Sequence, residues 1–119
     1  MFVAQPLAAV ETADSEQVSR DDIVIRRPSE RDISGLAALF SEMQSHYDRP
    51  VADEVATMAA KLACRPPVSK FDPHVLIALT GGAIVGSIVM NVTFPAFELT
   101  LSLHIRDLYI ATTARRRGV

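Results

Sequence analysis

One stretch near the C-terminal end carries more structural information than any other: residues 107–119, Asp107-Leu108-Tyr109-Ile110-Ala111-Thr112-Thr113-Ala114-Arg115-Arg116-Arg117-Gly118-Val119. Its first part is typical of a strand end, and a short link joins it to the arginines. A loop of backbone N–H groups that leads from a strand into a helix N-terminus can receive a phosphate, because unpaired donors and partial positive charge meet there. Gly118 would let the backbone come close to that phosphate. Taken alone, the arginines are equally compatible with a solvated basic tail.

The strand ahead of this loop is predicted over residues 99–110. Apolar residues occupy odd positions as far as Ile105 and even positions from Leu108 onward. One extra residue near Arg106 and Asp107 would restore a continuous apolar face, so the pattern predicts a β-bulge there. A strand end that is buried on both faces is the alternative.

Two helices are predicted in the first half of the chain, after a short strand at residues 23–25. Ser29 followed by Asp32 has the form of an N-cap with a carboxylate three residues later. The first helix then carries its apolar residues on one face at steps of three and four, namely Ile33, Leu36, Phe40, Met43 and Tyr47. The second helix is predicted over residues 53–64, with Val55, Met58, Ala59 and Leu62 on one side.

A hairpin is predicted between the second helix and the last strand. Two apolar runs, residues 75–79 and 84–92, flank Gly81 and Gly82. The element order is therefore β-α-α-β-β-β, an α/β (α+β) chain with a mixed, mainly antiparallel sheet flanked by helices. Residues 1–22 have no sustained period and are interpreted as a flexible extension, and the folded part is residues 23–119.

Composition limits the classes of protein that this chain can represent. With 119 residues it forms one small domain, and 49% hydrophobic residues can bury a core. A net charge of −2 and a lack of aromatic residues among the arginines argue against nucleic-acid binding. No apolar run is long enough to span a membrane. A single cysteine and no secretory signal favour the cytoplasm, and three dispersed histidines predict no metal site.

The ordered set of motifs resembles the GNAT (GCN5-related) N-acetyltransferases. Their acetyl-CoA signature is Arg/Gln-x-x-Gly-x-Gly/Ala after a strand, and Arg115-x-x-Gly118-Val119 matches its first five positions. Ile25-Arg26 ahead of Asp32 resembles the family's opening strand and helix, and residues 84–88 resemble its third strand. The resemblance covers residues 23–119 and implies an N-terminal part of such a domain, which ends inside the pyrophosphate loop.

The resemblance implies which residues would bind the substrates. Acetyl-CoA would lay its pantetheine arm along the backbone of Leu108, Tyr109 and Ile110. Its pyrophosphate would contact the loop made of Arg115, Arg116, Arg117, Gly118 and Val119. A primary amine would be the acceptor, and the first helix end would help to shape its pocket through His46, Tyr47 and Asp48.

Asp107 is the candidate general base, and a hydrogen-bonded strand-end carboxylate is the alternative reading. In the diamine acetyltransferase branch a Glu-Asp pair occupies this stretch. Arg106 stands where that Glu would be, which argues against polyamine chemistry. His104 is a second residue that could accept a proton near neutral pH, although a half-exposed strand side chain is its more common role.

The missing C-terminal half of a GNAT domain leads to two expectations. The chain alone should be inactive or nearly so. Its last strand should leave residues 99–110 unpaired along one edge, which invites self-association. A non-catalytic binding or assembly module that uses this edge is therefore the alternative function.

Overall fold

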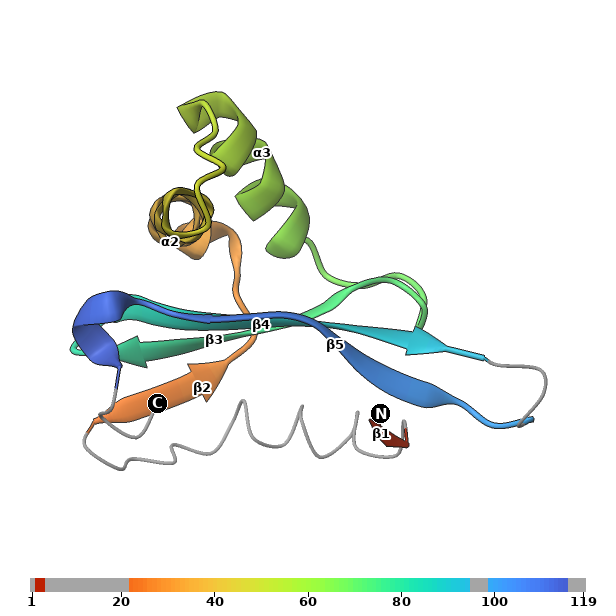
Figure 1. Cartoon of the computed structure of the whole chain (residues 1–119). Coiled ribbons are helices and arrows are strands. Elements are labelled where there is room, and N and C mark those ends of the chain that lie inside the picture. Colours follow the sequence, from red (N-terminus) through yellow and green to blue (C-terminus); the bar gives the residue numbers. More distant parts are fainter. Residues whose placement is uncertain (1, 4–21, 95–98, 116–119) are drawn as a thin grey trace.

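The chain folds into one antiparallel sheet with two helices on one of its faces (Figure 1). The computed structural model describes residues 2–3, 22–94 and 99–115. In chain order its strands are β1 (Phe2–Val3), β2 (Ile23–Arg26), β3 (His74–Thr80), β4 (Ala83–Thr93) and β5 (Ser102–Ile110), and in the sheet they lie in the order β1-β5-β4-β3-β2. The helices are α2 (Ile33–His46) and α3 (Asp53–Ala63), and two short 3-10 turns are η1 (Glu30–Asp32) and η2 (Thr112–Ala114). The predicted order of elements from residue 23 onward and the α+β class are confirmed.

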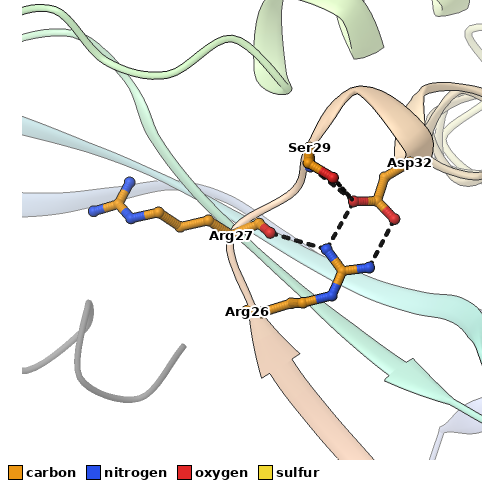
Figure 2. A network of polar contacts seen from close by, with 4 residues as sticks. All are labelled: Arg26, Arg27, Ser29 and Asp32. Atoms are coloured by element: carbon orange, nitrogen blue, oxygen red, sulfur yellow. Dashed lines mark hydrogen bonds and ion pairs between the residues drawn. The ribbon is translucent and has the colours of Figure 1, made fainter. Parts of the chain in front are cut away.

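A buried carboxylate joins β2 to α2. Asp32 is only 6% exposed, and its Oδ2 accepts the backbone N–H of Ser29 at 2.7 Å. Both terminal nitrogens of the Arg26 guanidinium donate to the two carboxylate oxygens, at 2.7 and 2.9 Å (Figure 2). The predicted cap is thus confirmed, although it opens η1 and α2 begins only at Ile33. Hydrogen bonding by Arg26 holds the pKa of Asp32 at about 2, below its ordinary value of 3.8.

The main core lies between the helices and the sheet. Leu36 of α2 and Ile77 of β3 are almost completely buried there, together with small residues of α3. The face of α3 predicted to be its apolar side is not the buried one. Ala56 and Ala60 point into the core, whereas Val55 and Leu62 are each 55% exposed. The physical reason is close packing: small alanines let α3 approach α2, and the bulkier residues lie outside the contact.

The predicted hairpin is confirmed between β3 and β4. Gly81 and Gly82 have φ values of 55° and 81°, and Thr80 pairs with Ala83 across the turn. A two-residue turn with positive φ at both positions matches the right-handed twist of the strands, and glycine adopts this conformation at little cost.

The start and the outer edge of β5 differ from the prediction. The strand begins at Ser102 rather than Leu99, because Leu99 has a φ of 54° and lies in a turn. The outer edge, which faces away from β4, is also not open along its whole length: Phe2 and Val3 of β1 pair with Leu103 and Ser102. Among the described residues, no strand pairs with this edge from residue 104 to residue 110.

A second, smaller apolar cluster lies on the sheet face opposite the helices. Met90 and Val92 of β4 and Leu103 of β5 are buried in it, with Leu76, Ile88 and Leu101 packed against them. Both faces of the central strands are therefore apolar, which explains why these strands show runs of hydrophobic residues rather than alternation.

Candidate functional site

A β-bulge interrupts the pairing of β4 and β5 where the sequence predicts one. Val89 pairs with Asp107, but its neighbour Met90 pairs with Ile105, so Arg106 has no opposite residue. The bulge shifts the alternation of side chains by one residue. Leu103, Ile105 and Leu108 thereby share the sheet face away from the helices, and Asp107 is brought to the helix side.

Asp107 lines a cavity between the two helices and the sheet. The cavity has a volume of about 390 Å³, and Phe40 and Met43 of α2, Val55 and Leu62 of α3, and Val89 of β4 lie around it. Among the described residues that line it, Asp107 is the only charged one. The bulge therefore places a single carboxylate at the wall of an apolar cavity.

The backbone of β5 after the bulge has two distinct edges. The N–H of Ala111 donates to the carbonyl of Val85 at 2.7 Å, so the backbone N–H and carbonyl of Ala111 point toward β4. The backbone N–H and carbonyl groups of alternate residues in an antiparallel strand point to the same side. Those of Tyr109 therefore also point toward β4, and those of Leu108 and Ile110 point to the outer edge. The carbonyl of Ile110 fits this assignment, because it accepts the Nε–H of Arg115 at 2.9 Å.

The side chain of Tyr109 joins the end of β5 to α2. It is 2% exposed, and its hydroxyl donates to Oε2 of Glu42 at 2.6 Å. The same carboxylate oxygen accepts the backbone N–H of Thr112 at 3.1 Å. Burial, followed by the hydrogen bond to Glu42, raises the pKa of Tyr109 above its ordinary value of 10.0. Glu42 thus fixes both the strand end and the turn that follows it.

Sequence reasoning does not find Glu42. It lies on the polar side of α2 and has no motif around it, and only the packing of α2 on β5 brings it to Tyr109. The tyrosine itself is predicted as a cofactor contact through its backbone, but its N–H and carbonyl point toward β4.

The end of α2 packs on the same tyrosine. The rings of His46 and Tyr47 lie 5.8 and 6.4 Å from the ring of Tyr109, centroid to centroid. Asp48 follows with a φ of 58° and leads the chain out of the helix. None of these three predicted acceptor contacts lines the cavity beside Asp107, where Gln44 is instead the last α2 residue. Their predicted role stays a prediction.

The predicted phosphate loop begins after η2. Arg115 places its guanidinium over the ring of Tyr109, 5.3 Å from the ring centroid, and its Nε–H binds Ile110. The side chain of Arg115 is therefore folded back along β5 rather than extended from it. The remaining predicted loop residues, Arg116, Arg117, Gly118 and Val119, lie outside the described part of the chain.

Two further features concern metals and membranes. Within residues 2–3, 22–94 and 99–115, no three His, Cys, Asp or Glu side chains lie close enough together to hold a metal ion. Neither α2 nor α3 is long and apolar enough to cross a bilayer.

His104 is half-buried on β5 opposite Asn91, and it lines a second cavity together with Arg106.

Comparison with known proteins yields matches at the level of structure only. No protein-family model matches the sequence, and a search of curated proteins finds no match. A solved structure of a possible acetyltransferase from Clostridium difficile 630 has a TM-score of 0.64 and 16% sequence identity, and the match covers 81% of this chain and 62% of that protein. A GNAT family acetyltransferase from Staphylococcus aureus subsp. aureus USA300_TCH1516 has a TM-score of 0.63 and 15% identity, with 82% and 68% of the two chains covered.

A third match is an aminoglycoside acetyltransferase, meta-AAC0020, from an uncultured soil metagenomic sample, solved in complex with sisomicin. Its TM-score is 0.59 at 20% identity, and the match covers 83% of this chain and 62% of that one. The chain thus spans 62% of the length of two of these three proteins. Identities this low establish the fold alone, and on that basis the chain has the fold of the GNAT acetyltransferases over a segment shorter than those proteins.

Proposed function

We propose that residues 23–119 form the N-terminal portion of an N-acetyltransferase domain, which moves an acetyl group from acetyl-CoA to a primary amine in the cytoplasm. The observation that carries this proposal is the bulge at Arg106. It turns Asp107 toward a cavity on one side of β5 and leaves Leu108 and Ile110 facing the outer edge, on a fold shared with acetyltransferases. A donor site and an acceptor site would then meet at one strand.

The outer edge of β5 fits the donor. The peptide groups of Leu108 and Ile110 face this edge, and no described strand pairs with them there. The carbonyl of Ile110 already accepts the Nε–H of Arg115. The N–H groups of Leu108 and Ile110 and the carbonyl of Leu108 could hydrogen-bond the amide groups of an extended pantetheine arm in the manner of an added strand. Arg115, the first residue of the proposed pyrophosphate loop, lies at the end of the same edge and supplies a positive charge there.

Acetyl-CoA supplies a thioester, whose carbonyl carbon is open to attack by an amine. In the proposed reaction the C–S bond breaks as the C–N bond forms, and the electron pair leaves with the thiolate of coenzyme A. The N–H of Leu108, on the outer edge, would donate to the developing oxyanion. Asp107 would accept the proton that the ammonium group must lose, directly or through water.

On the same proposal, the chain alone binds its substrates weakly and turns them over too slowly to measure. The chain spans only part of the length of the matching acetyltransferases. Binding is therefore the property to test.

The test is a titration of the ¹⁵N-labelled 119-residue chain with acetyl-CoA, followed by NMR. The largest amide shifts are expected at Leu108, Ile110 and Arg115, and the Arg115→Glu variant should weaken binding about tenfold through loss of a phosphate contact. Arg65→Glu, at the end of α3, is the matched control and should leave binding unchanged. Shifts that spare residues 108–115 at millimolar acetyl-CoA would contradict the proposed function.

A further inference from the structure

We infer that the cavity beside Asp107 binds an amine with an apolar body and a single positive charge, such as an alkyl or arylalkyl monoamine. This inference rests on the proposed function, since it names the class of acceptor that the same site would take. It distinguishes this chain from enzymes that bind acceptors with several amino groups.

The walls of the cavity are almost entirely apolar. Apart from Asp107, the described lining residues include only two polar side chains, Gln44 and Ser87. All others are apolar, among them Phe40 and Val75. A volume of about 390 Å³ lies in the range of sites for small molecules. An apolar body of that size would lose part of its contact with water against these walls.

Large apolar side chains of α3 are exposed at the cavity. Val55 and Leu62 line the cavity and are more than half exposed, although the same helix buries alanines in the core. Close packing of α2 and α3 accounts for the alanines at their contact, but it does not require large apolar side chains on the exposed side of α3. Here such side chains line a cavity, and apolar surface exposed in this way is typical of a binding site.

The described part of the cavity wall carries one charge, that of Asp107, whose side chain is exposed. One carboxylate can neutralise one ammonium group, so a ligand with further ammonium groups would have to keep that part of its body in water or place those groups against the apolar walls. Burying an unpaired charge there is strongly unfavourable. Polyamines and aminoglycosides should therefore bind worse than a monoamine of similar size, despite their stronger long-range attraction to a carboxylate.

The experiment measures binding of four probes to the 119-residue chain by NMR of its methyl groups: butylamine, hexylamine, hexanol and spermidine. Each added methylene should strengthen amine binding roughly fourfold, so hexylamine should bind about tenfold or more tighter than butylamine. Hexanol has the same body without the charge and should bind more weakly than hexylamine. Asp107→Asn should remove most of the difference between these two ligands.

A matched pair of variants tests the place of binding. Val55→Ser should weaken hexylamine binding several-fold, and Met58→Ser should not. Met58 is exposed to the same degree on α3 but does not line the cavity. Equal effects of the two variants, or tighter binding of spermidine than of hexylamine, would overturn the inference. So would a concentration-dependent dimer that buries Val55 and excludes hexylamine, because a second copy would then be the occupant.

The acetyl-CoA titration separates this inference from the proposed function. If acetyl-CoA shifts residues 108–115 and the cavity prefers spermidine, the acceptor class is wrong and the function stands. If hexylamine binds as expected and acetyl-CoA does not bind, the cavity is an amine site and the proposed acetyl transfer is wrong.

Discussion

The hydroxyl of Tyr109 donates a hydrogen bond of 2.6 Å to the carboxylate of Glu42, although 67 positions separate the two residues in the chain. Glu42 also accepts the N–H of Thr112, at 3.1 Å. One carboxylate on α2 therefore holds the last residues of β5 and the turn that leads to the proposed phosphate loop. The proposed donor site is built on this link, since Leu108 and Ile110 flank the tyrosine.

Replacing the tyrosine hydroxyl tests the strength of this link. Tyr109→Phe keeps the buried ring but removes the hydroxyl, one of the two donors to Glu42, and hydrogen bonds to charged groups contribute about 1.5–3 kcal/mol. We expect the free energy of unfolding to fall by about 2 kcal/mol in urea denaturation. Tyr47→Phe is the control: Tyr47 is exposed, so a change within about 0.5 kcal/mol is expected. Equal losses in both variants would contradict the assignment.

The raised pKa of Tyr109 predicts a loss of stability at high pH. The folded state binds the phenolic proton more tightly than the unfolded state does, so its contribution is fully present below pH 10 and is lost as pH rises through the raised pKa. The free energy of unfolding should therefore decline above pH 10 in the wild type. Tyr109→Phe should show a shallower decline over the same range, and parallel curves would refute the prediction.

The pKa of Asp32 predicts the opposite dependence at low pH. Because its folded pKa is about 2 against an ordinary 3.8, its contribution is present above pH 4 and is lost as pH falls toward 2. Asp32→Asn should cost about 2 kcal/mol at pH 7, and this difference should disappear near pH 2. Unfolding in urea at several pH values measures both. Asp22→Asn, at an exposed position, should change little, and a cost for Asp32→Asn that is independent of pH would contradict the prediction.

The close approach of Gly86 on β4 to Ile110 on β5 predicts that substitutions at these two positions affect stability together. A Cβ atom at this position would lie 2.8 Å from Cδ1 of Ile110, its cross-strand partner. Gly86→Ala should destabilise the chain by about 1 kcal/mol, because the isoleucine must move. In an Ile110→Val background that methyl group is absent, so the same substitution should cost less, measured as a double-mutant cycle. Additive effects would show that the contact is unimportant.

The thiol of Cys64 should react slowly in the folded protein. It is 8% exposed, and burial raises its pKa, so little reactive thiolate is available at neutral pH. We expect labelling by a thiol reagent to be roughly a hundredfold slower in the native chain than in guanidinium. Met58→Cys in a Cys64→Ser background supplies an exposed control that should react quickly in both states. Fast native labelling of Cys64 would mean that the α3 end opens readily.

Local signals in the sequence were sufficient for much of the fold. Gly81-Gly82 between two apolar runs specifies a tight hairpin, and Ser29 with Asp32 specifies a helix start, because each involves only neighbouring residues. The phase shift at Arg106 predicts the bulge for the same reason. The face of α3 was not predictable in this way. Its alanines pack inward only because α2 lies close, so the larger Val55 and Leu62 are left at the cavity.

Backbone conformation and side-chain alternation are local properties, so the order of elements, the hairpin, the cap and the position of the bulge could all be predicted from the residues themselves. The groups that meet across the fold were set by tertiary packing. It brought Glu42 to Tyr109 and Asp107 to an apolar cavity, and it turned the peptide groups of Tyr109 away from the outer edge that those of Leu108 and Ile110 face. These contacts depend on how helices pack on the sheet, and no pattern within a single segment encodes that packing.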